Sequence, residues 1–299
     1  MTWPDGSKIS VASRFPLSSA TTFRIGGPAE RAVMPRSTDE VAEALHVART
    51  EGWAVRCVGM GSNLLVDDGG VDGLVLLMRG LEGLDFEGTA VTVGAGITNN
   101  RILKAVRARG LTGLDCLVGY PGTLGGAVRM NAGGAPGYIG PLVEWVKGVE
   151  PSGRVSYRDG KACGFRYRGS DLDGFVVTEV RLRLRGDEDI EAATLRAAAI
   201  RDLKKATQPL HLPSAGCVWK NPGGGPPAGR LVDEAGCKGF RIGGAEVSEL
   251  HANFIVNRGE ATCADVLALM ADVRHRVHDR TGILLEQEVI HWSDAPVAV

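Results

Sequence analysis

Glycine-rich turns are the feature that most limits how this chain can fold. The sequence contains 42 glycines in 299 residues, about twice the usual share of roughly 7%. Many of them fall in three stretches, at residues 59–70, 119–140 and 223–229. Glycine allows sharp turns and close approach of the backbone to a ligand, so each stretch is either a set of tight turns or a ligand-binding loop. We expect ligand contact for the first two.

The first glycine run, Gly59-Met60-Gly61-Ser62-Asn63, begins like a dinucleotide-binding fingerprint but does not continue as one. Leu64 occupies the place of the third glycine, and Leu64-Leu65-Val66 predicts a strand, whereas the Rossmann motif requires a helix there. The pattern G-x-x-x-x-G-K-[ST] is absent as well. The sequence therefore predicts that this loop is not a Rossmann site.

A turn rich in Gly, Ser and Asn can still bind a diphosphate by directing successive backbone N–H groups toward it. The second run, Gly119-Tyr120-Pro121-Gly122-Thr123-Leu124-Gly125-Gly126-Ala127, offers the same chemistry. Either run alone is compatible with a purely structural turn. Together, the two loops suit one extended dinucleotide held between two lobes.

Charge and cysteine content exclude several classes of function. A net charge of -1 gives no electrostatic reason to expect a nucleic acid or an anionic membrane as partner. The six cysteines form no C-x-x-C pair and no Cys/His metal spacing, so no metal site is predicted. The first eight residues lack the apolar core of a signal peptide, and no segment approaches the roughly 18 apolar residues of a membrane span. We expect a cytoplasmic protein with free cysteines.

Periodicity predicts an α+β chain with a change of composition near residue 187. A capping box at 37–40 starts a helix that stops at Gly52, and Thr262 with Asp265 starts another to about Arg280. A charged, Ala-rich helix over 187–205 is expected to bridge two domains. The other expected elements are a helix at 97–109 and strands at 55–58, 64–66, 74–78, 91–93, 175–184 and 283–292.

The run Ser214-Ala215-Gly216-Cys217-Val218-Trp219-Lys220-Asn221-Pro222 resembles a signature of the UDP-N-acetylenolpyruvoylglucosamine reductases, flavoenzymes that make UDP-N-acetylmuramate for bacterial cell walls. The resemblance extends in order from about Pro16 to Trp292. Its other matching runs are Thr21-Thr22-Phe23-Arg24-Ile25-Gly26-Gly27, Gly61-Ser62-Asn63-Leu64-Leu65-Val66, Gly119 to Ala127, and Met130-Asn131-Ala132-Gly133. It departs from the family at Cys217, where serine is usual, and at Tyr120, where an aliphatic residue is usual.

The resemblance implies a two-lobed FAD-binding domain of the vanillyl-alcohol-oxidase (PCMH) type over 16–185, with lobes at about 16–78 and 79–185. A connecting helix at 186–205 and an α+β substrate-binding domain at 206–297 follow. Because neither glycine loop contains His or Cys, FAD is expected to be bound non-covalently. The residues expected to contact FAD are Gly59, Gly61, Ser62, Asn63, Leu64, Gly119, Pro121, Gly122, Thr123, Gly125 and Gly126.

Reducing an enolpyruvyl ether requires a hydride, stabilisation of an enolate-like intermediate and a positioned acid. The resemblance assigns Arg168 to the substrate carboxylate and enolate, Cys217 to proton donation, and Glu288 to assisting that proton delivery. Taken alone, each has a simpler interpretation: a surface ion pair for Arg168, a packed thiol for Cys217, a solvated strand edge for Glu288. Glu286 is the rival of Glu288, because alternate residues of a strand share a face.

The resemblance also assigns Tyr167 to the substrate pocket, and Lys205 and Asn221 to the uridine diphosphate. No tyrosine-bearing lid is present between Leu184 and Lys205, which is similar to the family's second type, lacking the tyrosine loop. The stretch from His251 to Asn257 also matches the family but receives no catalytic role.

The implied activity is that of a UDP-N-acetylmuramate dehydrogenase, an FAD-dependent enzyme that oxidises NADPH and reduces UDP-N-acetylglucosamine enolpyruvate. The two substrates would use one site in turn, and a monomer is expected. Two alternatives stay open. One is a flavoprotein oxidase of the same superfamily that acts on a small alcohol or hydroxy acid. The other is a nucleotide-sugar binding protein that has lost catalysis, with Cys217 as its lesion.

Overall fold

A computed structural model describes residues 9–186 and 188–293 of the chain. Three expectations fall partly or wholly outside these ranges: the absence of a signal peptide in the first eight residues, position 187 of the connecting helix, and the end of the expected C-terminal domain at 294–297. None of the helices in the described ranges is long and apolar enough to cross a membrane.

The chain alternates short strands with helices of very different lengths. The strands are β1 (Val11–Pro16), β2 (Pro28–Val33), β3 (Val55–Val58), β4 (Leu64–Val66), β5 (Val71–Leu77), β6 (Leu84–Glu87), β7 (Ala90–Gly94), β8 (Gly133–Gly134), β9 (Gly137–Tyr138), β10 (Val143–Val149), β11 (Val155–Asp159), β12 (Val176–Arg183), β13 (Ser214–Cys217), β14 (Arg241–Ile242), β15 (Ala245–Val247), β16 (Phe254–Asn257) and β17 (Ile290–Trp292). The α-helices are α1 (Thr38–Thr50), α2 (Asn99–Ala108), α3 (Leu124–Arg129), α4 (Ile190–Thr207), α5 (Ala228–Glu234) and α6 (Cys263–Thr281). Short 3-10 helices lie at Leu17–Ala20, Met78–Gly80, Asp115–Leu117 and Gly140–Leu142.

The first lobe is a four-stranded sheet in the order β1-β2-β5-β3. Strands β2, β5 and β3 are parallel, and β1 pairs with β2 in the antiparallel direction. Helix α1 begins after Ser37 as predicted, since the Ser37 side chain accepts a hydrogen bond from the Glu40 N–H. The predicted capping box is incomplete, because the Glu40 carboxylate accepts from the Arg36 N–H rather than from that of Ser37. The segment after the first glycine run forms strand β4 rather than a helix, so the prediction that this is not a Rossmann site is confirmed.

The second lobe is an antiparallel sheet in the order β11-β10-β12-β7-β6. Helix α3 packs against β12 and β7, and α1 contacts β5 as well as β10 and β12, so that α1 lies where the two lobes meet. The helix predicted at 97–109 is α2, which ends before Gly110, a residue with φ of +68°.

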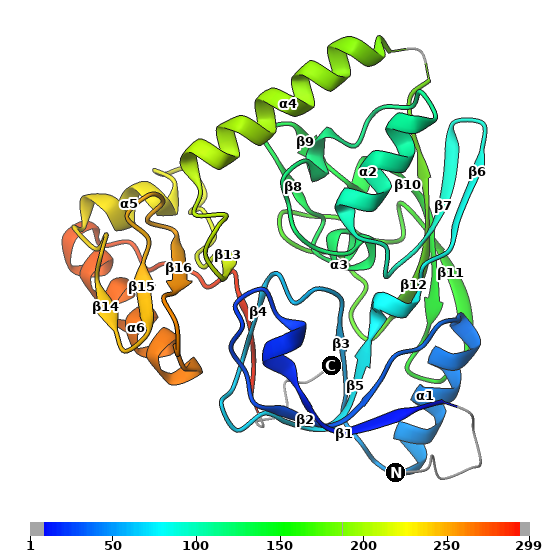
Figure 1. The fold of residues 1–299 in the computed structure, drawn as a ribbon, viewed down its shortest axis with the longest axis horizontal. Helices are drawn as coiled ribbons and strands as arrows, with labels where there is room; N and C mark the ends of the chain where they lie inside the picture. The colour runs from blue at the N-terminus through cyan, green and yellow to red at the C-terminus, as the bar shows by residue number, and fades with distance from the viewer. Residues whose placement is uncertain (1–8, 187, 294–299) are drawn as a thin grey trace.

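Helix α4 leaves the second lobe and leads to the C-terminal part of the chain, as Figure 1 shows. There a sheet in the order β13-β16-β15-β14 packs with α5 and α6. The predicted start of α6 is confirmed: the Thr262 side chain accepts from the Asp265 N–H, and the Asp265 carboxylate accepts from the Thr262 N–H. The α+β class of the chain is thereby confirmed.

The prediction of one strand over residues 283–292 is only partly correct, since β17 covers Ile290–Trp292 alone. Before β17 the backbone is hydrogen-bonded to the segment after β13. The Lys220 N–H donates to Glu286 O, and the Glu288 N–H donates to Val218 O. From Ile290 onward it pairs in parallel with β4 of the first lobe, and Figure 1 shows this red segment beside β4. The change of partner interrupts the strand.

Candidate functional site

An open pocket of about 350 Å³ lies in the C-terminal part of the molecule and reaches the second lobe. Its volume is within the range of small-molecule binding sites. Arg168, Cys217 and Glu288 all line it. They come from the loop between β11 and β12, from the end of β13, and from the segment before β17. The fold thus brings together the three residues expected to be catalytic.

Arg168 is held by a tight turn. The N–H groups of Arg166 and Gly169 each donate to the other residue's carbonyl, at 3.0 and 3.2 Å, and Arg168 has φ of +56°. Asn131 secures this turn, since its Nδ2 donates to Arg166 O at 3.0 Å. A left-handed non-glycine residue costs free energy and persists only where the surroundings enforce it, as happens at many functional sites. The Arg168 Nη1 donates to Gly133 O at 3.0 Å, which anchors the guanidinium at the pocket.

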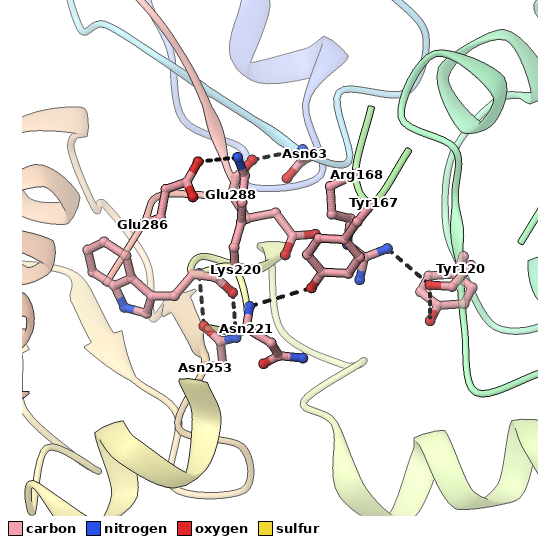
Figure 2. Close-up of polar contacts among 11 residues, drawn as sticks. Asn63, Tyr120, Tyr167, Arg168, Lys220, Asn221, Asn253, Glu286 and Glu288 are labelled. Carbon is pink, nitrogen blue, oxygen red and sulfur yellow. Dashed lines mark hydrogen bonds and ion pairs between the residues drawn. The ribbon is translucent and has the colours of Figure 1, made fainter. Parts of the chain in front are cut away.

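Glu288 forms an ion pair with Arg168, with 2.7 Å between Nε and Oε1, and both side chains are largely buried, at 11% and 19% exposure. Burial raises the pKa of the Glu288 carboxyl above its usual value, while the positive charge of Arg168 opposes that shift. The segment that carries Glu288 is anchored to the first glycine loop, since Asn63 Nδ2 donates to Glu288 O at 3.2 Å. Glu286, the rival candidate, is 71% exposed and pairs with Lys220 instead (Figure 2).

Cys217 is half-buried at the end of β13. Burial, and then the negative charge of Glu288, raise the pKa of its thiol to about 12, although Arg168 and Lys204 act in the opposite direction. Arg168 acts to lower this pKa, but the desolvation of the thiolate outweighs the attraction of the guanidinium. The thiol stays protonated at neutral pH, as a resting proton donor must.

Asn253 fixes the backbone two residues beyond Cys217. Its Oδ1 accepts from the Trp219 N–H and its Nδ2 donates to the Trp219 carbonyl, both at 2.9 Å, and Figure 2 shows the pair. Asn253 and His251 both line the pocket, although no catalytic role was expected for the stretch that contains them. A buried Asn between apolar residues was the available signal, because a buried amide requires hydrogen-bond partners.

Tyr167 contacts Asn221, which lines the pocket. The Asn221 N–H donates to the Tyr167 hydroxyl at 3.4 Å, as Figure 2 shows. The Asn221 side chain accepts from the Ala228 N–H at 3.0 Å and so holds the start of α5. Tyr167 is 47% exposed, which leaves its ring available to a ligand.

Of the two neighbouring lysines of α4, Lys204 is buried, whereas Lys205 is exposed on another face of the helix. Lys204 Nζ donates to Val118 O at 2.7 Å and lies 3.0 Å from the centroid of the Tyr120 ring. Burial, and then Arg168, lower the pKa of Lys204 to about 8. Lys204 shares a buried face of α4 with Ala193 and Ala197, and helical periodicity can predict such a shared face from the sequence.

The two glycine loops contact each other directly. A side-chain carbon at Gly59 would lie 2.2 Å from Thr123 Oγ1, and one at Gly122 would lie 3.2 Å from Ser62 Oγ. A carbon at Gly119, where φ is +72°, would lie 2.7 Å from Lys204 Cδ. Of the other residues expected to contact FAD, the backbone places Leu64 in β4, Pro121 on the exposed side of its loop, and Gly125 and Gly126 in the first turn of α3.

Both loops retain unused hydrogen-bonding groups that fit a diphosphate. Among the described residues, no protein acceptor is hydrogen-bonded to the N–H groups of Gly61, Ser62 and Asn63, nor to those of Gly122 and Thr123. Such groups in glycine turns bind anionic oxygens. Beside them, Asn99 Oδ1 is buried and has no partner in the protein, so an additional donor would satisfy it. The residues present therefore fit a bound dinucleotide.

Comparisons with known proteins agree with this arrangement. Residues 29–156 match the family model described as an FAD binding domain, and residues 208–292 match that of the UDP-N-acetylenolpyruvoylglucosamine reductase C-terminal domain. The reductase of that name from Moorella thermoacetica is 44% identical over 291 residues, which are 97% of this chain and 95% of the relative. The one from Desulfosudis oleivorans is 43% identical over 288 residues, 92% of each chain.

Solved structures show the same likeness at the level of the fold. The crystal structure of the reductase from Thermus caldophilus superposes with a TM-score of 0.82 at 36% identity, covering 96% of this chain and 99% of that one. A solvent-stable cholesterol oxidase superposes over 62% of this chain and 40% of its own, with a TM-score of 0.50 at 22% identity. The latter shows a shared FAD-domain fold, as expected for the vanillyl-alcohol-oxidase type. The extent and identity of these matches show that the chain belongs to the UDP-N-acetylenolpyruvoylglucosamine reductase family.

Proposed function

We propose that this chain reduces UDP-N-acetylglucosamine enolpyruvate to UDP-N-acetylmuramate at the expense of NADPH, with FAD bound non-covalently along the two glycine loops. FAD-dependent reduction of the enolpyruvyl sugar nucleotide is the activity of the family. The observation that carries the proposal for this chain is the convergence of Arg168, Cys217 and Glu288 on one pocket. A flavoprotein oxidase of the wider superfamily has no need of that set.

When bound, FAD supplies the hydride that reaches the methylene carbon of the enolpyruvyl group. Arg168 stabilises the negative charge that develops on the substrate carboxylate and enolate. Its planar fork can hold two oxygens at once, which a lysine ammonium cannot. Its bond to Gly133 O keeps the guanidinium oriented before the substrate arrives, and such preorganisation is the main source of electrostatic catalysis.

Cys217 supplies the proton. The S–H bond breaks as a C–H bond forms at the carbon next to the carboxylate, and the thiolate then recovers a proton from solvent. The raised pKa of the thiol keeps the donor loaded at neutral pH, while the positive charge of Arg168 stabilises the thiolate left behind. Glu288, whose carboxyl pKa is also raised, assists this transfer at the same end of the pocket.

The remaining polar residues at the entrance bind the nucleotide. We assign Tyr167 to the sugar side of the pocket and Asn221 to the uridine diphosphate. The sequence favours Lys205 for that diphosphate, whereas the burial and contacts of Lys204 favour Lys204 for it. The sequence between Leu184 and Lys205 contains no tyrosine-bearing lid, as expected for the second type of the family.

We also propose the domain limits expected from the sequence, with FAD-binding lobes at 16–78 and 79–185, a connecting helix at 186–205 and a substrate domain from 206. A monomer in the cytoplasm, contributing to cell shape and division through peptidoglycan synthesis, is the setting that fits a soluble nucleotide-sugar substrate and NADPH.

One experiment tests the proposal. Purified protein should show an oxidised flavin spectrum that bleaches with NADPH under anaerobic conditions and recovers when the enolpyruvyl sugar nucleotide is added. Acid precipitation should then release all the yellow colour into the supernatant, because the flavin is not covalently attached. Bleaching without recovery would indicate a binding protein that has lost catalysis, and bleaching by an alcohol instead would indicate an oxidase.

A further inference from the structure

Three side chains of metal-binding type meet beside β4 and β17, and none of them lines the pocket described above. Asp67 directly follows β4, Cys263 is the first residue of α6, and His291 lies in the middle of β17. Their ligand atoms all lie within 4.8 Å of one another. The residues are far apart in sequence, so the spacing rules that predicted no metal site had no means of finding them.

The three ligand atoms converge on one point. His291 Nε2 lies 2.6 Å from Asp67 Oδ1 and 3.5 Å from Cys263 Sγ, and the Sγ lies 3.4 Å from the same Oδ1. In a proton relay the two ring nitrogens of a histidine face different partners. Here a single nitrogen faces both the thiol and the carboxylate. That is the geometry of a shared ligand rather than of a relay.

We propose that Asp67, Cys263 and His291 form a zinc site. Thiolate, imidazole and carboxylate together are the ligand set that zinc prefers, whereas magnesium and calcium prefer oxygen alone. Tetrahedral zinc bonds of ordinary length place sulfur about 3.4–3.6 Å from a neighbouring nitrogen or oxygen ligand. The two sulfur distances already match. The nitrogen and oxygen, now at hydrogen-bond distance, would separate by about 0.8 Å.

The surroundings hold the ligands in place and leave a coordination position open. The backbone of Asp67 is fixed on both sides, since its N–H donates to Trp292 O and its carbonyl accepts from Gly27 N–H. Cys263 is buried, whereas the side chains of Asp67 and His291 are 34% and 25% exposed. Water can therefore reach the metal as a fourth ligand. The neighbouring Asp68 is already used, because it accepts from the Cys263 and Ala264 N–H groups.

Zinc at this position would join the first lobe to the C-terminal part of the chain. His291 lies three residues after Glu288, in the segment that Asn63 also anchors. A metal bound to His291 would hold this segment against β4 without touching the substrate. Because the metal would join two parts of the chain away from the substrate pocket, its loss should affect stability far more than turnover.

The test is zinc binding to the FAD-loaded protein after treatment with a chelator, measured by equilibrium dialysis against Zn²⁺ and metal analysis. Loss of an outer-sphere partner alone typically weakens metal affinity about 10- to 100-fold, so Asp67→Asn and His291→Ala should weaken it at least that much. The controls His275→Ala, an exposed histidine of α6, and Cys237→Ser, a buried cysteine elsewhere, should bind zinc like the wild type.

A second measurement separates a zinc site from a hydrogen-bonded contact. Zinc should raise the unfolding midpoint of the wild type and of both controls, and should not raise that of Asp67→Asn, which keeps the shape of the carboxylate. Turnover and FAD content report whether each variant has folded. Wild-type protein that binds no zinc, or binds it as tightly as Asp67→Asn and His291→Ala, would overturn the proposal.

Discussion

The two parts of the candidate site are built in different ways. The two glycine loops proposed to bind FAD consist mainly of backbone and glycine, and the residues of each loop are close in sequence. The reducing site consists of side chains from three distant segments, which carry Arg168, Cys217 and Glu288. The close contact of the loops depends on the absence of a side chain at their glycines. The reducing site depends on the chemistry of the atoms present. Substitutions that add volume should therefore disturb the glycine loops. Substitutions that change a functional group should disturb the site of Arg168, Cys217 and Glu288.

The largest effect should come from removing the proton donor. Cys217→Ala should lower turnover by about a hundred- to ten-thousandfold, while FAD reduction by NADPH continues because it needs no proton from this thiol. Cys217→Ser should keep substantial activity. Anaerobic stopped-flow spectroscopy measures the two half-reactions separately, and Cys237→Ala is the control. An alanine variant as active as the wild type would make Cys217 a packing residue.

The pH dependence of the wild type follows from the same thiol. A donor works only when protonated, so activity is lost when pH rises above its pKa. Because that pKa is about 12, wild type and Cys217→Ser should both lack an alkaline limb from residue 217 between pH 6 and 9. A limb in that range that is present in the wild type and absent in the serine variant would show that the thiol ionises more readily than its burial implies.

Arg168→Lys should have the next largest effect on turnover. The charge is kept but the two-pronged geometry is lost, and removal of one preorganised donor costs on the order of a hundredfold in turnover. Reduction of FAD by NADPH should change much less. Arg166→Lys is the matched control, because Arg166 is exposed and pairs with Asp171. Near-normal turnover in Arg168→Lys would remove Arg168 from the mechanism.

In the glycine loops, one added methyl group should be enough to lower both stability and FAD content. In Gly59→Ala the new carbon would lie 2.2 Å from Thr123 Oγ1, so the loops must separate, at a cost of about 1–3 kcal/mol of stability and a loss of FAD content. Gly69→Ala is the control in the same stretch, since nothing lies within 4 Å of its added carbon. Thermal unfolding and the flavin-to-protein absorbance ratio measure both effects. Equal behaviour of the two variants would contradict the close contact of the loops.

The smallest effect on activity is expected from changing the charge of Lys204. It is a cation below its pKa of about 8 and neutral above it, so kcat/KM for the anionic sugar nucleotide should fall above that pH by up to about tenfold per unit. Lys204→Met should show a lower and flatter profile, whereas Lys205→Met should follow the wild type. The opposite outcome for the two variants would restore the assignment of Lys205.

Sequence patterns predicted well what depends on neighbours in the chain. The strand character of Leu64-Leu65-Val66 and the capping of α6 by Thr262 are local properties, and both are confirmed. The resemblance to the family supplied Arg168, Cys217 and Glu288. By contrast, the interrupted strand before β17 depends on a change of hydrogen-bonding partner, which no local pattern encodes.

The same limit applies to single side chains. A count along the sequence favoured Lys205, while the orientation of α4 presents Lys204 to the site. The raised pKa of Cys217 follows from burial, which a motif does not reveal. The cluster of Asp67, Cys263 and His291 exists only once β17 has paired with β4.

The pairing of β17 with β4 also determines when this part of the protein can fold during synthesis. Leu64 pairs with Ile290, and Asn63 and Glu288 just before them are 225 positions apart. During synthesis β4 therefore lacks its partner strand until residues 290–292 have left the ribosome. Contacts this distant form late and slowly. A ribosome-bound chain that lacks the residues after Glu288 would therefore contain β4 without its partner strand β17.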